Sequence, residues 1–256
     1  MRRIRLVIEY QGTHYVGWQR QPNGISVQAC IEKAIFEITG ETVSLQGSGR
    51  TDSGVHALAQ VAHFDTQARM PGDKFAIALN MHLPQDIRIL FSQDVSPDFH
   101  ARFSAKEKSY RYTLQTGPHA RVLHRERALH VHVPLDLPAM EAAAAMVVGT
   151  HDFRAFKSAG IEMENTTRQV LSSGWSREGV LLHYDVTGTG FLYNMVRILV
   201  GTMLDIGRGY LPLSTMEKAL ITGDRSCAGA TAPAHGLTMM RVRYPDFDTD
   251  EVLRSL

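Results

Sequence analysis

Patterns typical of strands and helices occur in two successive series along this chain, and this order constrains the fold more than any other feature. The first series opens with Ile4, Leu6, Ile8 and Tyr10, whose alternation predicts a half-buried strand. A helix capped by Ser26 and ended by Gly40, a strand near 59–64, a helix near 73–81 and a strand at 87–95 are predicted to follow it.

The second series begins with a strand that places Tyr110, Tyr112 and Leu114 on one face. A helix near 137–148, strands near 169–175 and 180–186, and a last strand containing Met240, Val242 and Tyr244 are predicted after it. Two strand-and-helix units predict an α+β fold, with helices on one face of a mainly antiparallel sheet. We expect halves at 1–104 and 105–256 that share one sheet, because no low-complexity linker separates them.

The most informative short segment is residues 47–57, where Asp52 lies among glycines and small residues with Arg50 two positions before it. Glycine permits tight backbone paths and the close approach of a large substrate. A carboxylate beside a guanidinium stays ionised at neutral pH, ready to act as a nucleophile or a base. The alternative is an ordinary Asx-turn in a glycine loop.

A second informative segment surrounds Arg197, the single charged residue between Asp185 and Asp205. Apolar residues on every side of this segment predict a buried helix, and its glycines and polar residues argue against a membrane span. Because an isolated buried charge is very unfavourable, Arg197 requires a carboxylate or an anion nearby. Several acidic residues of the chain fit that role.

Charge and cysteine content place limits on the function. The net charge is only +1, yet arginines outnumber lysines 21 to 6, and the basic residues gather between 102 and 127. That stripe favours contact with RNA phosphates, and a solvated face is the alternative. Cys30 and Cys227 lie far apart, and the first residues lack the apolar run of a signal peptide, so we expect a cytoplasmic protein. The acidic residues at 246–251 are expected to form a solvated end.

The run Gly49-Arg50-Thr51-Asp52-Ser53-Gly54-Val55-His56-Ala57 closely resembles the signature of the tRNA pseudouridine synthase A family. Further blocks that resemble the family lie in its order at 10–13, 17–22, 99–105, 110–112, 151–153, 191–197 and 232–237. The resemblance therefore extends over nearly the whole chain. One small departure is Gln11, at a position where the family usually has an aspartate.

The resemblance implies two ferredoxin-like halves with a central active-site cleft, and conversion of uridine to pseudouridine at positions 38, 39 and 40 of the tRNA anticodon arm. Asp52 would be the nucleophile, attacking C6 of the base or C1′ of the ribose, or it would abstract the 2′ proton. Tyr110 would stack on the flipped-out base, and Arg197 would orient Asp52. Strand alternation alone does not choose between Tyr110 and Tyr112.

The remaining implications concern binding. Arg50 would fill the space left by the base or grip its phosphate, and Leu237 would line the uracil pocket. Ser53 and His56 are interpreted as residues that brace the loop. The reaction has no redox change, so we expect no redox cofactor. We expect no metal either, because the histidines show no accepted metal-ligand spacing. A homodimer and the absence of a membrane association are also expected.

Two other functions remain open at this stage. The first is a silent RNA-binding protein on the same fold, because fold does not dictate function. The set Asp52, Tyr110 and Arg197 counts against it. The second is an unrelated hydrolase with a carboxylate nucleophile, which would need a second acid or base, and a metal, close to Asp52.

Overall fold

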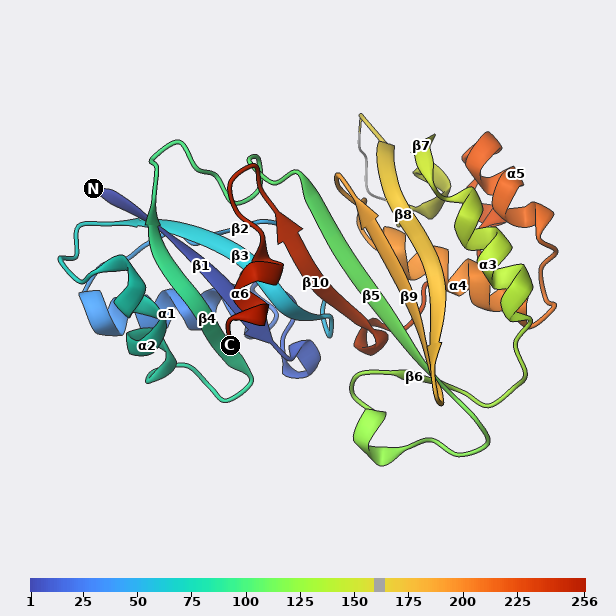
Figure 1. Ribbon diagram of the computed structural model, residues 1–256, viewed down its shortest axis with the longest axis horizontal. Helices are drawn as coiled ribbons and strands as arrows, with labels where there is room; N and C mark the ends of the chain where they lie inside the picture. Colours follow the sequence, from blue (N-terminus) through green and yellow to red (C-terminus); the bar gives the residue numbers. More distant parts are fainter. Residues whose placement is uncertain (159–163) are drawn as a thin grey trace. The chain divides into compact units, whose positions relative to one another are not determined.

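The computed structural model describes residues 1–158 and 164–256 and divides into two compact units (Figure 1). Unit 1 contains Met1–Lys108 and Thr238–Leu256, and unit 2 contains Ser109–Leu237. The last segment of the chain therefore belongs to unit 1, whereas the division at residue 104 expected from the sequence places it with the C-terminal half.

Unit 1 is built on strands in the order β4-β1-β3-β10. β1 (Arg2–Tyr10) pairs antiparallel with both β3 (His56–Thr66) and β4 (Ile87–Val95), and the short β2 (Gln46–Gly47) pairs with the far side of β3. β10 (Leu237–Arg243) lies parallel to β3, with Thr238 opposite His56. This parallel pairing explains why the final strand joins unit 1: it returns from the far end of the chain to the strand that follows the Asp52 loop.

The first helix of unit 1 begins and ends where the sequence predicts. In α1 (Val27–Thr39) the Ser26 hydroxyl accepts a hydrogen bond from the Ala29 N–H at 3.2 Å, and Gly40 ends the helix with φ of 73°. The second helix is shorter than predicted, because Gly72–Lys74 form a 3-10 turn before α2 (Phe75–Asn80). α2 packs against β4 and α1, over fully buried residues such as Phe75.

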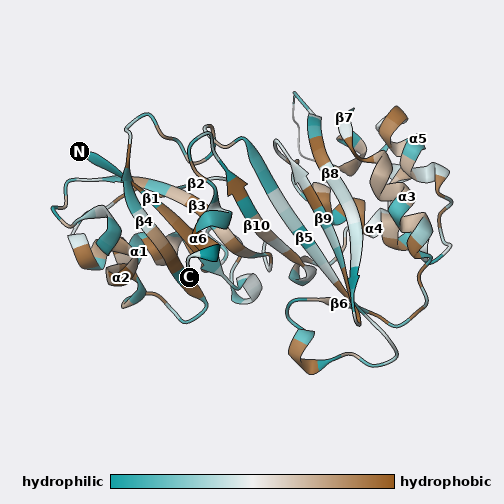
Figure 2. Ribbon diagram, in the orientation of Figure 1, coloured by the Kyte–Doolittle hydropathy of each residue, from teal (hydrophilic) through white to brown (hydrophobic). Residues whose placement is uncertain are grey.

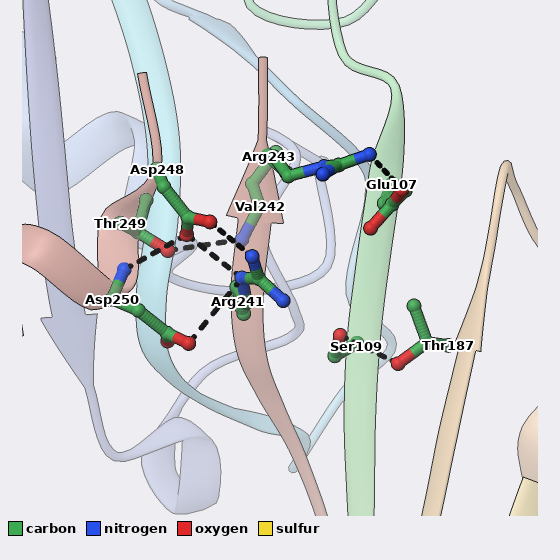
Figure 3. Close-up of polar contacts among 9 residues, drawn as sticks. All are labelled: Glu107, Ser109, Thr187, Arg241, Val242, Arg243, Asp248, Thr249 and Asp250. Carbon is green, nitrogen blue, oxygen red and sulfur yellow. Dashed lines mark hydrogen bonds and ion pairs between the residues drawn. The ribbon is translucent and has the colours of Figure 1, made fainter. Parts of the chain in front are cut away.

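The acidic C-terminal segment is not simply a solvated end, so that expectation is wrong in part (Figure 3). Asp248 caps α6 (Thr249–Arg254) by accepting from the Asp250 N–H at 3.1 Å, and its carboxylate also binds Arg241 of β10. The Arg241 guanidinium holds the pKa of Asp248 below its usual range. The Thr249 hydroxyl also links α6 to β10, because it accepts a hydrogen bond from the Val242 N–H at 3.0 Å. These acids therefore fasten α6 to β10.

Unit 2 has the strand order β5-β9-β8-β7, with β6 parallel to β5. β5 (Glu107–Thr116) lies beside β9 (Leu181–Gly188), and Ser109 of β5 meets Thr187 of β9 (Figure 3). The contacts Arg111–Asp185 and Thr113–His183 follow in the opposite order along β9, so the two strands run antiparallel. The other strands are β6 (Leu129–Val131), β7 (Gly149–Asp152) and β8 (Thr167–Glu178). Tyr110, Tyr112 and Leu114 are all buried, as the alternation predicts.

The helices of unit 2 gather beside β7 and β8 (Figure 1). They are α3 (Leu137–Met146), α4 (Met195–Gly207) and α5 (Ser214–Thr222), of which α3 packs on both β8 and α4. α4 is buried along almost its whole length, as its apolar sequence predicts. In the described part of the chain, no helix combines the length and the apolar character that a membrane crossing needs. The predicted α+β fold with mainly antiparallel strands is confirmed.

Candidate active site

Asp52 lies in an irregular loop of unit 1, between β2 and β3, and its side chain is half-buried. The loop closes on itself through the Val55 N–H, which donates to the Asp52 carbonyl at 3.1 Å. Next to it, the Thr51 hydroxyl lies 2.7 Å from the Tyr10 hydroxyl, and the Thr51 carbonyl accepts from the Trp18 N–H at 3.1 Å. Thr51, the residue before the aspartate, is thus tied to the end of β1 and to the segment that follows it.

Two glycines of that segment allow its backbone to pass directly against the loop. A Cβ built on Gly12 would lie 2.0 Å from the Val55 carbonyl oxygen, and one on Gly17 would lie 2.6 Å from the Thr51 carbonyl oxygen. Gly17 also has φ of 111°, a conformation that L side chains rarely adopt. The two glycine-containing blocks at 10–13 and 17–22 therefore shape the loop by backbone contact, a role that the sequence pattern did not reveal.

A network of polar side chains fixes the start of the loop. The Gln60 amide donates to the Gly49 carbonyl at 2.9 Å and accepts from the Ser48 hydroxyl at 2.5 Å. The Lys108 ammonium donates to the Ser48 carbonyl from the first residues of β5. Burial, with a smaller contribution from Arg102, lowers the pKa of Lys108 to about 8. Sequence reasoning missed both Gln60 and Lys108; the lysine was counted only as part of the basic stripe.

The remaining residues of the loop separate into bracing and exposed groups. The His56 imidazole is buried and accepts from the Gly12 N–H at 3.0 Å, and the Ser53 hydroxyl donates to the Tyr15 carbonyl at 3.2 Å. Both residues brace the loop, as expected. Arg50 is exposed, and within the described residues its guanidinium makes no hydrogen bond or ion pair. That guanidinium is available to a ligand.

Tyr110 and Tyr112 share a face of β5 in unit 2, yet their surroundings differ. Tyr112 is fully buried, donates to the Pro233 carbonyl at 2.8 Å and lies against Gly236, where a Cβ would come within 2.5 Å of its ring. Burial raises its pKa. Tyr110 instead meets Phe191 edge to face, with ring centroids 5.2 Å apart. Tyr112 is therefore held in place through its hydroxyl, and the Tyr110 ring packs against Phe191.

Arg197 lies in the first turn of α4 and is half-buried. Its Nε donates to the Ala232 carbonyl at 2.8 Å, and its guanidinium also donates to the Asn194 side-chain oxygen at 2.8 Å. Asn194 has φ of 60°, the one positive φ among the non-glycine residues that the structure describes, and it donates to the Ser158 hydroxyl at 2.6 Å. A strained residue that orients a charged side chain is typical of a functional site.

The segment 229–237 is packed tightly against α4 and ends in Leu237, which is 6% exposed. A Cβ on Gly201 of α4 would lie 1.7 Å from the Ala230 carbonyl oxygen, and the Gly229 N–H donates to the Thr202 hydroxyl at 2.9 Å. The Ala232 N–H returns a hydrogen bond to the Arg197 carbonyl at 3.1 Å. Backbone contact therefore fixes both Arg197 and the residues that lead to Leu237.

The basic residues of 102–127 do not form one stripe. Lys108 points to the Asp52 loop, and Arg111 pairs with Asp185 at 2.7 Å. The loop between β5 and β6 carries the exposed Arg121 and Arg127, which make no hydrogen bond or ion pair through their side chains in the described structure. Figure 2 shows a hydrophobic turn in this loop, and it contains Leu123, which is 91% exposed.

A metal-dependent site finds no support among the described side chains. Across residues 1–158 and 164–256, no three histidine, cysteine, aspartate or glutamate side chains come together as ligands. The groups at the Asp52 loop are its carboxylate and the hydroxyl, amide and ammonium groups of Thr51, Gln60 and Lys108 that surround its backbone.

The sequence of this chain matches one family of known proteins. The sequence model of tRNA pseudouridine synthase covers residues 6–104 and 143–245. Curated relatives named tRNA pseudouridine synthase A include that of Acetivibrio thermocellus, 46% identical over 95% of this chain and 100% of its own length. The protein of Ruminiclostridium cellulolyticum is also 46% identical with the same coverage, and that of Halalkalibacterium halodurans is 47% identical over 93% of this chain and 90% of its own. The chain therefore belongs to the tRNA pseudouridine synthase A family, a family of enzymes.

Proposed function

We propose that this protein isomerises uridine to pseudouridine in tRNA, at positions 38, 39 and 40 of the anticodon arm, with Asp52 as the nucleophile. The observation that carries the proposal is Asp52 itself, a half-buried carboxylate on a loop whose two sides are fixed by Gly12, Gly17 and Gln60 in a member of this family. A fixed carboxylate reaches a substrate atom without first having to order its own backbone.

The reaction breaks the N1–C1′ bond, rotates the uracil and forms a C5–C1′ bond, so N1 gains a proton and C5 loses one. Asp52 has three routes to promote this exchange: addition to C6, attack on C1′, or removal of the 2′ proton. Each route requires an ionised carboxylate. Each also requires the target base to leave its stack, because no side chain reaches these atoms inside a helix.

The other site residues have roles that match their environments. Tyr110, held by its ring against Phe191, stacks on the flipped base and assists removal of the C5 proton. Arg197, oriented by Ala232 and Asn194, holds the Asp52 carboxylate. Leu237 lines the uracil pocket, and the exposed Arg50 fills the space that the base leaves or grips its phosphate.

Recognition of the tRNA body calls for positive charge away from the reacting base. Arg121 and Arg127, exposed on the β5–β6 loop, are suited to phosphate contacts because acidic side chains do not neutralise them. A homodimer acting in the cytoplasm, in which one subunit holds the tRNA while the other carries out chemistry, completes the proposal.

The decisive test is tritium release from an unmodified tRNA transcript that carries 5-tritiated uridine. Wild-type protein is expected to release tritium, because C5 loses its hydrogen only when the new carbon–carbon bond forms. Asp52→Asn is expected to bind tRNA normally and to release none, since the amide keeps the shape of the carboxylate and lacks its charge.

Ser53→Ala is the matched control in the same loop, since it removes a bracing hydroxyl and leaves the carboxylate in place. It should keep most of the activity. Isomerisation by Asp52→Asn at a rate close to that of wild type would disprove the role of Asp52. Tight tRNA binding without release by wild-type protein would instead support a silent RNA-binding protein.

A further inference from the structure

An exposed aromatic ring and an exposed arginine occupy the turn that follows β4 in unit 1. Phe103 is 75% exposed, and the Arg102 guanidinium lies 5.6 Å from the centre of its ring. In the described structure Arg102 makes no hydrogen bond or ion pair through its side chain. Several other arginines of the protein, such as Arg3 and Arg241, bind carboxylates. Neither residue of the pair has a role in the reaction described above.

The turn that carries this pair is fixed by hydrogen bonds to imidazoles. The His63 imidazole accepts from the Ala101 N–H at 3.1 Å, and the His100 imidazole accepts from the Arg102 and Phe103 N–H groups at 3.1 and 3.3 Å. Burial lowers the pKa of His63 to about 4 and also lowers the pKa of His100, so both rings are neutral acceptors at physiological pH. The turn is therefore preorganised and does not need a ligand to order it.

The same two imidazoles begin a series of rings that ends at the surface. The His63 and His100 rings meet edge to face with centroids 4.7 Å apart, and the His100 and Phe103 rings lie 4.3 Å apart at an angle of 33°. His63 is buried, whereas Phe103 is largely exposed. The Phe103 ring is thus supported by the His100 ring and is still 75% exposed, so most of its surface is accessible to a further flat ring.

The position of the pair relates it to the Asp52 loop within the same unit. The charge of Arg102 contributes to lowering the pKa of Lys108, and the Lys108 ammonium donates to the Ser48 carbonyl at the start of that loop. Arg102 therefore lies close enough for its charge to act on Lys108, a residue that contacts the loop.

We propose that Phe103 and Arg102 form a nucleotide-binding site outside the catalytic pocket, in which the base of a nucleotide flanking the target uridine stacks on Phe103 and its phosphate binds Arg102. The proposal rests on the proposed function for its substrate, an RNA. Single-stranded nucleotides present a flat ring and a phosphate together, and an aromatic platform beside an arginine suits that combination.

The direct test is tryptophan fluorescence of Phe103→Trp during titration with an unmodified tRNA transcript. Stacking of a base on the introduced indole should quench its emission, after subtraction of the wild-type titration that accounts for Trp18 and Trp175. Phe36→Trp is the matched control, since Phe36 is a half-exposed phenylalanine on α1 of the same unit. Its indole should keep its emission throughout the titration.

Kinetics supply a second test. Phe103→Ala should raise KM for the tRNA about tenfold and leave kcat within about twofold, because stacking contributes to binding and not to the chemical step. Phe103→Tyr keeps a ring at this position and should keep the wild-type KM. Arg102→Gln should weaken the salt dependence of tRNA binding. The slope of the logarithm of the association constant against the logarithm of the salt concentration should become less steep by about one.

The outcomes separate this site from the proposed reaction. Quenching of Phe103→Trp without any tritium release by wild-type protein would support the nucleotide site and reject the isomerase. Normal turnover with no quenching and an unchanged KM for Phe103→Ala would overturn the site. Quenching that follows protein concentration in the absence of RNA would also overturn it, since a second copy of the chain would then cover Phe103.

Discussion

The Asp52 loop of unit 1 and the Arg197 turn of unit 2 hold their charged residues by different physical means. The loop is irregular and takes its shape from backbone atoms in contact, with Gly12 and Gly17 pressed against the Val55 and Thr51 carbonyl groups. Arg197 instead lies on a buried helix, and its long side chain is oriented by hydrogen bonds to the Ala232 carbonyl and the Asn194 side chain.

This difference predicts which changes each region tolerates. A loop shaped by backbone contact has no room for an added methyl group, because the atoms opposite cannot rotate away. At a position where hydrogen bonds orient the side chain, a replacement must keep both the charge and the donors. Activity should therefore fall when the planar guanidinium of arginine is lost.

The largest effect is expected from Gly12→Ala. The new Cβ would lie 2.0 Å from the Val55 carbonyl oxygen, so the segment after β1 and the Asp52 loop must separate. We expect a loss of stability of about 3 kcal/mol and a fall in turnover of more than about a hundredfold. Urea denaturation and single-turnover tritium release measure the two effects separately.

Gly174→Ala is the control for this prediction, because a Cβ on Gly174 of β8 meets nothing within 4 Å. It should change stability by less than about 0.5 kcal/mol. Wild-type turnover by Gly12→Ala would show that the loop does not depend on this close approach.

Arg197→Lys should have the next largest effect. Lysine keeps the positive charge but lacks the fork that reaches Ala232 and Asn194 together, so we expect kcat to fall roughly tenfold to a hundredfold with little change in KM. Arg197→Met should lose more activity and gain little stability, since it removes the positive charge as well as the fork. Equal rates for wild type and Arg197→Lys would mean that a point charge is sufficient at this position.

The smallest effect concerns pH and Lys108. Burial lowers the pKa of this lysine from 10.5 to about 8, so between these two values the unfolded chain binds more protons than the folded protein. Stability contributed through Lys108 must therefore rise as the pH increases from about 8 to 10.5. Because the buried tyrosines titrate in the opposite sense, the measurement is the difference in stability between wild type and Lys108→Met, which does not titrate at this position. In denaturation curves at several pH values, this difference should shift in favour of wild type as the pH increases from about 8 to 10.5.

Lys106→Met is the matched control, because Lys106 is exposed two residues earlier in the chain. It should show the same pH dependence of stability as wild type. Turnover should also fall at alkaline pH in wild type, since the neutral amine is a weaker donor to the Ser48 carbonyl than the ammonium group. An identical alkaline profile in Lys108→Arg, which keeps its charge over this range, would contradict that role.

The sequence predicted most local structure because local structure depends on neighbouring residues. Ser26 and Gly40 delimit α1 through capping and a left-handed φ, both of which are properties of one or two residues. Alternation placed Tyr110, Tyr112 and Leu114 on the buried face of β5. The part of the site that residue types determine, a carboxylate in a glycine loop and a lone arginine in an apolar helix, was predictable on the same grounds.

What depended on distant partners was not predictable. Alternation assigns a strand to a face but does not choose its neighbour, so the parallel pairing of β10 with β3 emerged only in the folded chain. The acidic residues near the C-terminus looked solvated because their partner, Arg241, lies on another element. In the sequence, Lys108 is one of several basic residues between 102 and 127. Only the folded structure shows that its ammonium group donates a hydrogen bond to the Ser48 carbonyl.

The sequence by itself thus determined the α+β class, the helix ends, the family and the candidates Asp52, Tyr110 and Arg197, since periodicity, capping and motif order are local properties. The tertiary structure alone decided that Gly12 and Gly17 shape the Asp52 loop and that Phe103 is exposed on a support of imidazole rings. Contacts between residues far apart in the chain have no local signature, because many pairings satisfy the same hydrophobic pattern and only packing selects among them.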